Sequence, residues 1–341
     1  MSANESDMCH KWMMDLYRKQ NVTLAEVNDR LLLRFLGGIC FLSVLVVAGL
    51  IGNAHVLYIY YRKFRLTNYR IYVLWLAMLD MFNCGISAPC VIFYLLHPVT
   101  FPSEIFCKIF RFLLYFCNVA STASLIPIAI DRGRKILSPL KSQITTTQAK
   151  MMCIMSLFVG LVLSWPAPIL FGIYSERTGI PGLKGQRCLI EDRYVKSKEV
   201  TVFNMVHFIY FFVVTALLTI VYSLISRQMC IHGSFRQSFQ QSYADTDISK
   251  ENAPRLTSIQ RSTLTLLLVT LVYILSALAY HILALVFFSS PNFDCNLSLP
   301  GAIVYYTFIW SYFINSAINP FIYGFRDYTF RKEIKQLYNG L

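Results

Sequence analysis

A single acidic side chain lies inside a long apolar segment of this sequence. Asp80 is near the middle of residues 71–96, where a carboxylate is costly in a membrane unless it faces a polar interior. Ser121, Asn315 and Asn319 lie at matching depths in two other apolar segments. These four residues predict a hydrated cluster that could hold a cation such as sodium. The alternative is a hydrogen-bonded contact between helices without an ion.

Two short motifs lie at the ends of other apolar segments. Asp131-Arg132-Gly133 ends the third segment, where the five donors of a guanidinium could hold neighbouring helices or meet the carbonyls of a partner. Asn319-Pro320-Phe321-Ile322-Tyr323 ends the last segment, and Pro320 removes a backbone hydrogen bond where the helix can bend. Taken alone, the first motif is a basic flank and the second is a kink.

Enzyme chemistry is not indicated by any of the motifs that we sought. The chain contains no HExxH, GxxxxGK[ST] or GxSxG motif. The paired repeats and broken helices typical of transporters are not evident either. We therefore expect no enzymatic activity and no cofactor, apart from the sodium ion considered above.

The apolar segments define the expected fold. Hydrophobic residues make up 56% of the 341 residues and charged residues only 14%, which excludes an ordinary soluble domain. Each apolar segment reaches the ~20 residues that a membrane-spanning helix needs. We predict an all-α bundle of seven transmembrane helices, followed by an amphipathic helix in the membrane interface. The expected spans are Phe35–Tyr61, Ile71–Leu96, Ile105–Ile130, Met151–Tyr174, Val200–Ile225, Leu264–Phe288 and Ala302–Tyr323, and the interfacial helix is Phe325–Tyr338.

The charges predict how the chain is oriented. The net charge is +13, but the basic residues are spread over short loops, so we expect membrane lipid rather than nucleic acid as a partner. Basic residues follow the first, third and last spans, which places these ends and the C-terminus in the cytoplasm. The sequons at Asn4, Asn21 and Asn296 all fall on the outer side, together with the N-terminus, and are the expected glycosylation sites.

Four of the ten cysteines lie in segments assigned to the outer side, where thiols can oxidise. Cys107 begins the third span and Cys188 lies in the longest outer loop, so a bridge between them would hold that loop across the bundle. A second bridge, between Cys9 and Cys295, would tie the N-terminal tail to the last outer loop. The alternative is that these thiols are unpaired.

Together, these features resemble the rhodopsin-like family of G protein-coupled receptors, and the resemblance extends from Gly52 to Lys335. The matching residues are Gly52-Asn53, Leu76-Ala77-Met78-Leu79-Asp80, Cys107, Asp131-Arg132, Trp165, Tyr222, and Asn319-Pro320 with Tyr323. The family implies a plasma-membrane receptor whose outward pocket is coupled to an inner cleft that opens for a heterotrimeric G protein.

The resemblance also implies domains and roles. Residues 1–34 would be an extracellular tail, 35–324 the seven-transmembrane receptor domain, and 325–341 a cytoplasmic amphipathic helix with a short tail. The residues implied in activation and G protein coupling are Asp131, Arg132, Tyr222, Asn319, Pro320 and Tyr323. The implied sodium site consists of Asp80, Ser121, Asn315 and Asn319.

Three positions depart from the family pattern. Gly133 replaces the usual Tyr after Asp-Arg, Val214 replaces the proline of the fifth helix, and Ser276-Ala277-Leu278-Ala279 replaces Cys-Trp-x-Pro in the sixth. The sixth helix therefore lacks the usual toggle side chain and kink. An alternative function follows: a receptor-fold protein that binds a ligand or another receptor without activating a G protein, as a decoy or modulator.

The expected pocket favours a peptide ligand. Leu114 occupies the position where amine receptors carry Asp, and Phe313 the position of the retinal-binding Lys of opsins, so amines and retinal are not expected. Arg111 could pair with a carboxylate of the ligand, or its side chain could extend to the outer interface. A metal at His207 and His281 is less expected than hydrogen bonding. The lining residues are Arg111, Leu114, Tyr115, Asn118, His207, Tyr280, His281 and Tyr305, and the sequence around residues 130–135 resembles the neuropeptide branch.

Overall fold

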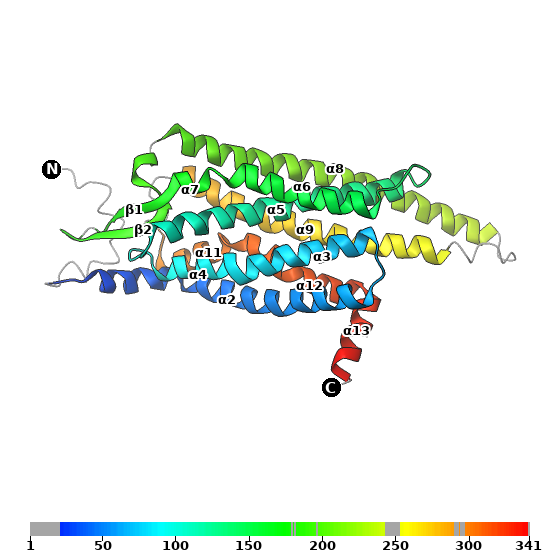
Figure 1. Cartoon of the computed structure of the whole chain (residues 1–341), viewed down its shortest axis with the longest axis horizontal. Coiled ribbons are helices and arrows are strands. Elements are labelled where there is room, and N and C mark those ends of the chain that lie inside the picture. The colour runs from blue at the N-terminus through cyan, green and yellow to red at the C-terminus, as the bar shows by residue number, and fades with distance from the viewer. Residues whose placement is uncertain are drawn as a thin grey trace.

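The computed structural model describes residues 21–178, 180, 182–195, 197–242, 253–289, 293 and 297–339. Long helices lie side by side along one axis, and a two-stranded hairpin lies at one end of the bundle (Figure 1). A short C-terminal helix lies at the other end and points away from the bundle axis. We call these two ends the hairpin end and the C-terminal end.

Most of the described chain is helical. The elements are α2 (Leu24–Lys63), α3 (Asn68–Phe82), a π-helical turn (Asn83–Ser87), α4 (Ala88–Leu96), α5 (Glu104–Leu137), α6 (Thr146–Ser164), α7 (Ala167–Leu170), β1 (Phe171–Arg177), β2 (Lys184–Ile190), a 3-10 turn (Asp192–Tyr194), α8 (Lys198–Ser242), α9 (Ala253–Ser289), α11 (Leu299–Phe308), a 3-10 turn (Ser311–Phe313), α12 (Ile314–Arg326) and α13 (Tyr328–Asn339).

Six helical segments of the described chain are long and apolar enough to cross a membrane. They are Leu24–Lys63, Asn68–Leu96, Glu104–Leu137, Thr146–Leu170, Lys198–Ile231 and Ile259–Phe287. The seventh predicted span is divided into α11, a 3-10 turn and α12. Near this break, the hydroxyl of Ser311 donates to the backbone carbonyl of Ser276 in α9 over 2.8 Å. The predicted all-α bundle of seven transmembrane helices is confirmed, and its seventh helix is broken.

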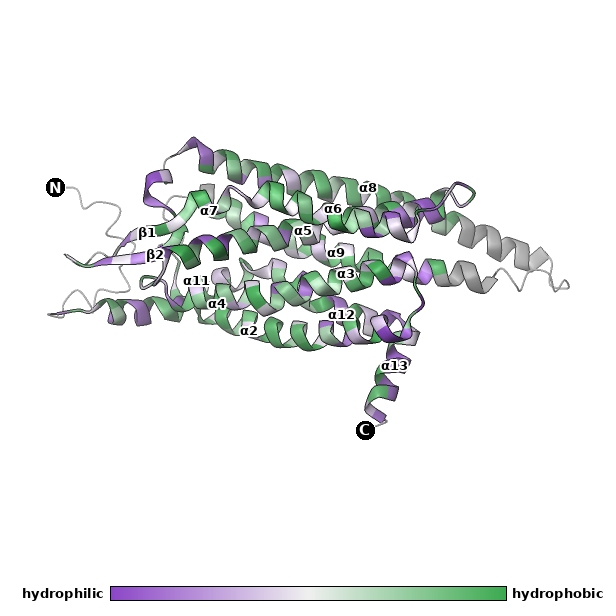
Figure 2. Cartoon of the chain, viewed as in Figure 1, coloured by the Kyte–Doolittle hydropathy of each residue, from purple (hydrophilic) through white to green (hydrophobic). Residues whose placement is uncertain are grey.

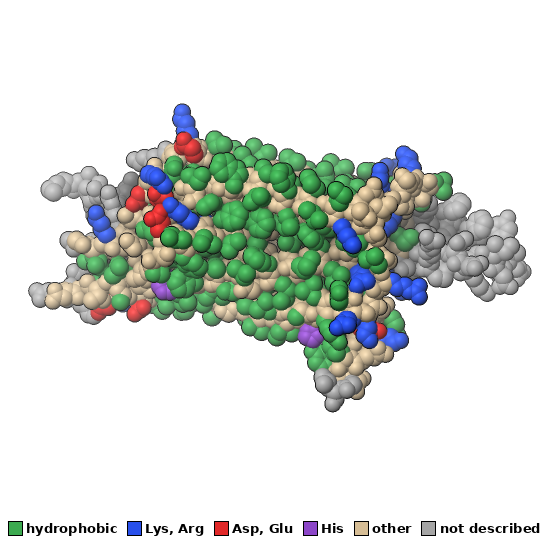
Figure 3. Space-filling view, in the orientation of Figure 1, with side chains coloured by type: hydrophobic (Ala, Val, Ile, Leu, Met, Phe, Trp, Pro, Cys, Tyr) green, Lys and Arg blue, Asp and Glu red, His purple; other side chains and the backbone are tan. Residues whose placement is uncertain are grey.

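The surface of the bundle is suited to lipid. Hydrophobic residues run along the helices, and hydrophilic residues gather toward the two ends (Figure 2). Figure 3 shows a broad band of hydrophobic side chains across the middle of the visible face, with Lys and Arg side chains at the C-terminal end. Exposed residues of α6 such as Ile154, Phe158 and Leu161 belong to this apolar surface. A band of this extent would be unfavourable in water, so it supports a protein that crosses the membrane several times.

The first helix begins earlier than predicted, at Leu24 instead of Phe35. The hydroxyl of Thr23 accepts a hydrogen bond from the backbone N–H of Glu26, and the Glu26 carboxylate accepts one from the N–H of Thr23. This reciprocal capping box satisfies two backbone donors that a helix start leaves free. The first turns are polar, so hydropathy alone could not locate them.

Other helix bounds also differ from the prediction. The fourth span was expected to continue to Tyr174, but α6 ends at Ser164 and the chain enters β1 at Phe171. Pro166 and Pro168 lie between these points, and proline cannot donate the backbone hydrogen bonds that continue a helix. In the polar stretch 227–262 between the fifth and sixth predicted spans, the chain is helical to Ser242 and again from Ala253.

Small residues allow the first helix to approach its neighbours closely. A Cβ atom added at Gly49 would lie 2.3 Å from Cys84 Sγ, and one added at Gly52 would lie 2.8 Å from Pro320 Cβ. Close backbone approach is a main source of packing energy between helices in lipid. Gly52 therefore allows α2 to pack closely against α12 at Pro320.

The C-terminal helix is anchored to α2 through its apolar face. Phe330 is buried, and its ring centre lies 5.7 Å from that of Tyr60. The Tyr338 hydroxyl lies 2.6 Å from His55 Nε2, and Lys63 Nζ lies 3.5 Å from a Glu333 oxygen. The helix projects from the side of the bundle (Figure 1), as expected of an amphipathic helix along a membrane surface.

A disulfide holds the hairpin on the bundle. β1 and β2 pair antiparallel from Phe171 opposite Ile190 to Arg177 opposite Lys184. Cys188 of β2 is bonded to Cys107 in the first turn of α5, with the two Cα atoms 5.5 Å apart. The predicted Cys107–Cys188 bridge is thus confirmed. Cys9 and Cys295 lie outside the described residues, so the second bridge stays a prediction.

Loss of this bridge should destabilise the folded protein. Cys107→Ser should lower the free energy of unfolding by about 2–4 kcal/mol, because the unfolded chain is no longer restricted by the cross-link. The thermal midpoint of the purified protein in detergent measures this. Cys40→Ser, which changes an exposed free cysteine, is the matched control. Equal midpoints for the two variants would contradict the expectation.

Candidate functional site

Asp80 is a buried carboxylate that α12 holds through Asn319. Asp80 is fully buried in α3, and Asn319 Nδ2 of α12 donates to its Oδ2 atom over 2.7 Å. The other carboxylate oxygen of Asp80 has no hydrogen-bond partner in the described chain, and the same holds for Ser121 Oγ, Asn315 Oδ1 and Asn319 Oδ1. All four predicted residues are buried, and oxygen atoms are the ligands that hard cations prefer.

Two further amides extend this polar interior. Asn53 Nδ2 of α2 donates to the carbonyls of Gly49 and Ser316, over 2.9 and 2.8 Å. Asn83 Nδ2, in the π-helical turn, donates to Ser316 Oγ over 3.2 Å. Sequence reasoning assigned no role to Asn53 or Asn83, although an amide inside an apolar segment is the same kind of signal as Asp80. These amides join α2 and the π-helical turn to α12.

The Asp131-Arg132 motif forms a buried charged cluster toward the C-terminal end. Arg132 is 2% exposed, and its guanidinium is paired with the Asp131 carboxylate. Lys135 Nζ lies 3.0 Å from the same carboxylate. Asn68 Nδ2 donates to Asp131 Oδ1 over 2.6 Å and to the carbonyl of Ile144 over 2.8 Å. Asn68, which the sequence did not single out, thus connects α3, α5 and the segment before α6.

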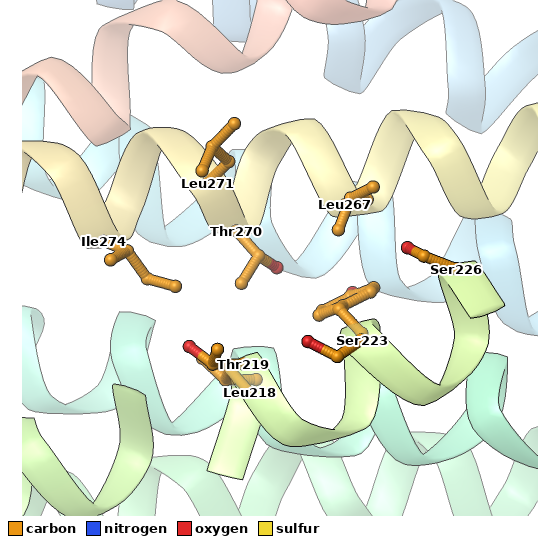
Figure 4. Close-up of a pocket in the computed structure, with 9 residues that line it drawn as sticks. Leu218, Thr219, Ser223, Ser226, Leu267, Thr270, Leu271 and Ile274 are labelled. Atoms are coloured by element: carbon orange, nitrogen blue, oxygen red, sulfur yellow. The ribbon is translucent and has the colours of Figure 1, made fainter. Parts of the chain in front are cut away.

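Two tyrosines of the predicted activation set have buried hydroxyls. Tyr222 in α8 and Tyr323 in α12 are buried, and neither hydroxyl has a hydrogen-bond partner in the described chain. Tyr222 lines a cleft of about 250 Å³ between α8 and α9. Hydroxyl-bearing residues of both helices also line it, including Ser223 and Thr270 (Figure 4). Helices that are separated by a cleft have room to shift against each other.

At the hairpin end, Arg111 points into the protein. It is 8% exposed, and its Nη2 atom donates to the carbonyl of Cys188 over 2.6 Å. Its guanidinium carbon lies 5.1 Å from the ring centre of Phe171 and 5.0 Å from that of Tyr94. The side chain therefore lies beneath the hairpin. The alternative in which it extends to the outer interface is not what the structure shows.

The predicted pocket residues form two aromatic groups. Tyr115 lies 4.9 Å from both Phe203 and His207, measured between ring centres, and His207 Nε2 is buried without a partner. In the second group, Tyr280 lies 5.2 Å from Tyr312, and His281 stacks on Phe211 at 3.8 Å. The structure thus joins most of the predicted lining residues through rings of α8 and of the broken seventh helix.

The other predicted pocket residues are more dispersed. Leu114 is buried and Asn118 is partly buried in α5, while Tyr305 lies in α11 with its ring centre 5.4 Å from that of Phe293. The sequence did not single out Tyr94, which lies beside Arg111, or Tyr312, which lies beside Tyr280. Aromatic residues are common in the predicted spans, so their presence alone did not indicate a site. Among the described residues, no group of three or more His, Cys, Asp or Glu is placed to hold a metal ion.

Comparison with known families decides the classification. Residues 52–323 match the family described as 7 transmembrane receptor (rhodopsin family). This chain belongs to that family. The resemblance of the motifs is therefore confirmed, and the family is one of receptors rather than enzymes.

The receptor is also similar to individual members of the family. It is 24% identical to growth hormone secretagogue receptor type 1 of Homo sapiens, over 93% of this chain and 89% of that protein. It is 24% identical to the Oryctolagus cuniculus protein of the same name, over 69% of this chain and 62% of the relative. Neuropeptide S receptor of Macaca mulatta is 26% identical, over 56% of this chain and 50% of the relative. Some alignments thus span less than two thirds of the relatives.

Asn68 and Lys135, two of the three donors to Asp131, should contribute unequally to the stability of the receptor. Asn68→Ala should lower the free energy of unfolding by about 1–3 kcal/mol, because it leaves a buried carbonyl and carboxylate oxygen unpaired. Lys135→Ala should cost less than about 1 kcal/mol, because the Lys135 side chain is 24% exposed and its ion pair is partly solvated. Thermal unfolding of both purified variants tests the order, and the reverse order would contradict it.

Proposed function

We propose that this receptor binds an extracellular peptide at the hairpin end and activates a heterotrimeric G protein at the C-terminal end. The proposal rests on one observation: two candidate sites lie toward opposite ends of the same helix bundle. An aromatic, cationic lining lies at the hairpin end, and the Arg132 cluster lies toward the C-terminal end. Binding at the first site can shift a population of states that differ at the second.

Charge and covalent chemistry support the orientation. The hairpin end carries the start of α2, the Asn21 sequon and a disulfide, which forms in oxidising compartments. The C-terminal end is rich in Lys and Arg (Figure 3), as cytoplasmic ends are. We place the receptor in the plasma membrane with residues 1–34 outside and 325–341 in the cytoplasm. Asn4 and Asn296 are the other proposed glycosylation sites and lie outside the described residues.

The pocket chemistry supports a peptide as ligand. Rings of Tyr115, Tyr280 and Tyr305 offer broad apolar contact with polar edges, and Arg111 adds a positive charge. Relatives of this receptor are named as receptors for a growth hormone secretagogue and for neuropeptide S. The proposed ligand-binding residues are Arg111, Leu114, Tyr115, Asn118, His207, Tyr280, His281 and Tyr305.

The buried residues toward the C-terminal end have the properties of a switch. Arg132 is held by Asp131, and the buried hydroxyls of Tyr222 and Tyr323 have unused hydrogen-bonding capacity. Release of Arg132 and a shift of α8 against α9 would give these groups new partners. Asn319 and Pro320 would let the end of α12 move with them, because proline removes one backbone hydrogen bond of the helix. Such a change would open the cytoplasmic face to a G protein.

One observation favours a second function, binding without G protein activation. Ser276, Ala277, Leu278 and Ala279 lie within α9, which is helical from Ala253 to Ser289. The helix has neither an indole nor a proline kink at these positions. A straight sixth helix would move less readily, and the protein would then serve as a decoy or modulator.

Arg132→Ala distinguishes the two functions. Calcium and cyclic AMP would be measured in cells that express the receptor and are exposed to a neuropeptide library. We expect a response that Arg132→Ala reduces at least about tenfold, while peptide binding at the surface is kept. Arg134→Ala, which changes an exposed neighbour, is the control and should respond as the parent does. Peptide binding without any response in the parent receptor would favour the non-activating alternative.

The sodium site can be tested separately. At a sodium concentration of about ten times the Kd, binding to the folded receptor should raise the free energy of unfolding by about 1.4 kcal/mol. Asp80→Asn should remove this effect, because the amide lacks the negative charge that attracts the ion. The measurement is the thermal midpoint in sodium chloride against choline chloride at equal ionic strength. A sodium-dependent shift that persists in Asp80→Asn would exclude this site.

A further inference from the structure

Two arginines converge on one tyrosine ring at the hairpin end. The guanidinium carbon of Arg111, in α5, lies 5.0 Å from the ring centre of Tyr94, and that of Arg187, in β2, lies 5.7 Å from it. Arg187 Nε also donates to the Tyr94 hydroxyl over 3.1 Å. Tyr94 is at the end of α4, so three separate elements bring two positive charges to one aromatic side chain.

The charges at this point are only partly neutralised. Arg111 has no carboxylate within ion-pair distance in the described chain, and its buried Nε atom has no hydrogen-bond partner. Its contacts are a carbonyl oxygen and aromatic rings. Arg187 has a Glu176 oxygen 4.0 Å from Nη1, at the limit of an ion pair. Buried cations normally have a closer anionic partner, because desolvation of a charge is costly.

Two other cations at the same end are neutralised within the protein. Lys108 Nζ lies 2.5 Å from Glu104 and 3.5 Å from Glu191, and Arg193 Nε lies 2.8 Å from Glu191. Arg111 and Arg187 are less exposed than these two, yet neither has a carboxylate closer than 4.0 Å in the described chain. An anionic group of a ligand can supply what the protein itself does not.

We infer that Arg111, Arg187 and Tyr94 form a subsite for a carboxylate group of the peptide ligand, an inference that rests on the proposed function. A ligand would reach Arg187 first, because the Arg187 side chain is 19% exposed whereas Arg111 is buried below the hairpin. The planar guanidinium groups match a carboxylate, and the Tyr94 ring holds both groups by cation–π contacts. The carboxylate belongs either to the C-terminus of the peptide or to an Asp or Glu side chain.

A purely structural role explains less of the geometry. The hydrogen bond from Arg111 to the carbonyl of Cys188 does help to hold the hairpin on α5. A neutral amide could supply that bond, however, without the cost of burying a charge. The second arginine from β2 adds to the repulsion, which a structural contact alone would not require. Both facts are accounted for when an anion completes the site.

Affinity selection from defined peptide pools tests the inference. The full-length receptor in lipid nanodiscs would be exposed to random heptapeptides, and bound peptides would be identified by mass spectrometry. Four pools would be used: free-acid or amidated C-termini, each with or without Asp and Glu. The receptor variants are Arg111→Gln, Arg187→Gln, and Arg193→Gln as the matched control, since Arg193 is an exposed cation paired with Glu191.

The parent receptor should enrich peptides that carry a carboxylate, and Arg111→Gln and Arg187→Gln should each reduce that enrichment at least about tenfold. Arg193→Gln should change it less than about twofold. Enrichment from the free-acid pool without Asp or Glu identifies the terminal carboxylate, whereas enrichment from the amidated acidic pool identifies a side chain. Arg187→Gln keeps the test decisive if Arg111→Gln folds poorly, because Arg187 is partly exposed.

The negative outcomes separate the two proposals. Enrichment of amidated peptides without Asp or Glu, unchanged in both arginine variants, would overturn the subsite and leave the peptide receptor standing. No enrichment from any pool, with a receptor that keeps its disulfide and its thermal midpoint, would count against a peptide ligand altogether. Equal losses in all three variants would show a general charge effect and would also overturn the subsite.

Discussion

The low polarity of lipid is the constraint on which the rest of this receptor depends. Backbone groups inside a bilayer have no water to bind, so the spanning segments must be helices that satisfy their own hydrogen bonds. The same constraint applies to each polar side chain in the bundle. Asn53 bonds to the Ser316 carbonyl, Asn319 bonds to Asp80, and Asn68 bonds to Asp131. These contacts join helices that are distant in sequence and give the bundle its internal order.

The polar groups that are not satisfied are as informative as those that are. One carboxylate oxygen of Asp80 and the hydroxyls of Tyr222 and Tyr323 are buried without a hydrogen bond in the described chain. A buried polar group without a partner raises the energy of the state in which it occurs, so a state that supplies the partner gains stability. The cleft beside Tyr222 provides the space for such a change. This combination suits a protein that must exchange two conformations of similar energy.

The hairpin connects the proposed ligand side of the receptor to its core. The bond between Cys188 and Cys107 fixes β2 on α5, and the Cys188 carbonyl accepts the hydrogen bond of Arg111. Arg187 extends from the same strand toward Tyr94. A ligand that pairs with these arginines would therefore act on the hairpin and on α5 together. The other end of α5 carries Arg132, so the proposed ligand site and the proposed switch share one continuous helix.

The sequence by itself predicted the seven spans, the amphipathic C-terminal helix and, with unpaired thiols as the alternative, the Cys107–Cys188 bridge. The spans and the C-terminal helix could be predicted because hydropathy is a property of consecutive residues and can be read from the sequence. It also singled out Asp80 and Arg132, because a charge in or beside an apolar segment is conspicuous. It did not locate the start of the first helix at Leu24, where a capping box rather than hydropathy acts.

Only the tertiary structure decided the partners of these residues. Asn53 and Ser316 are 263 positions apart, and Arg111 and Cys188 are 77 apart. The rotation and close approach of whole helices bring such pairs together, and Gly52 against Pro320 is one contact that sets this approach. Arg111, Arg187 and Tyr94 are brought together from three elements in the same way. Hydropathy fixes which segments enter the membrane, whereas packing between segments fixes which side chains face one another.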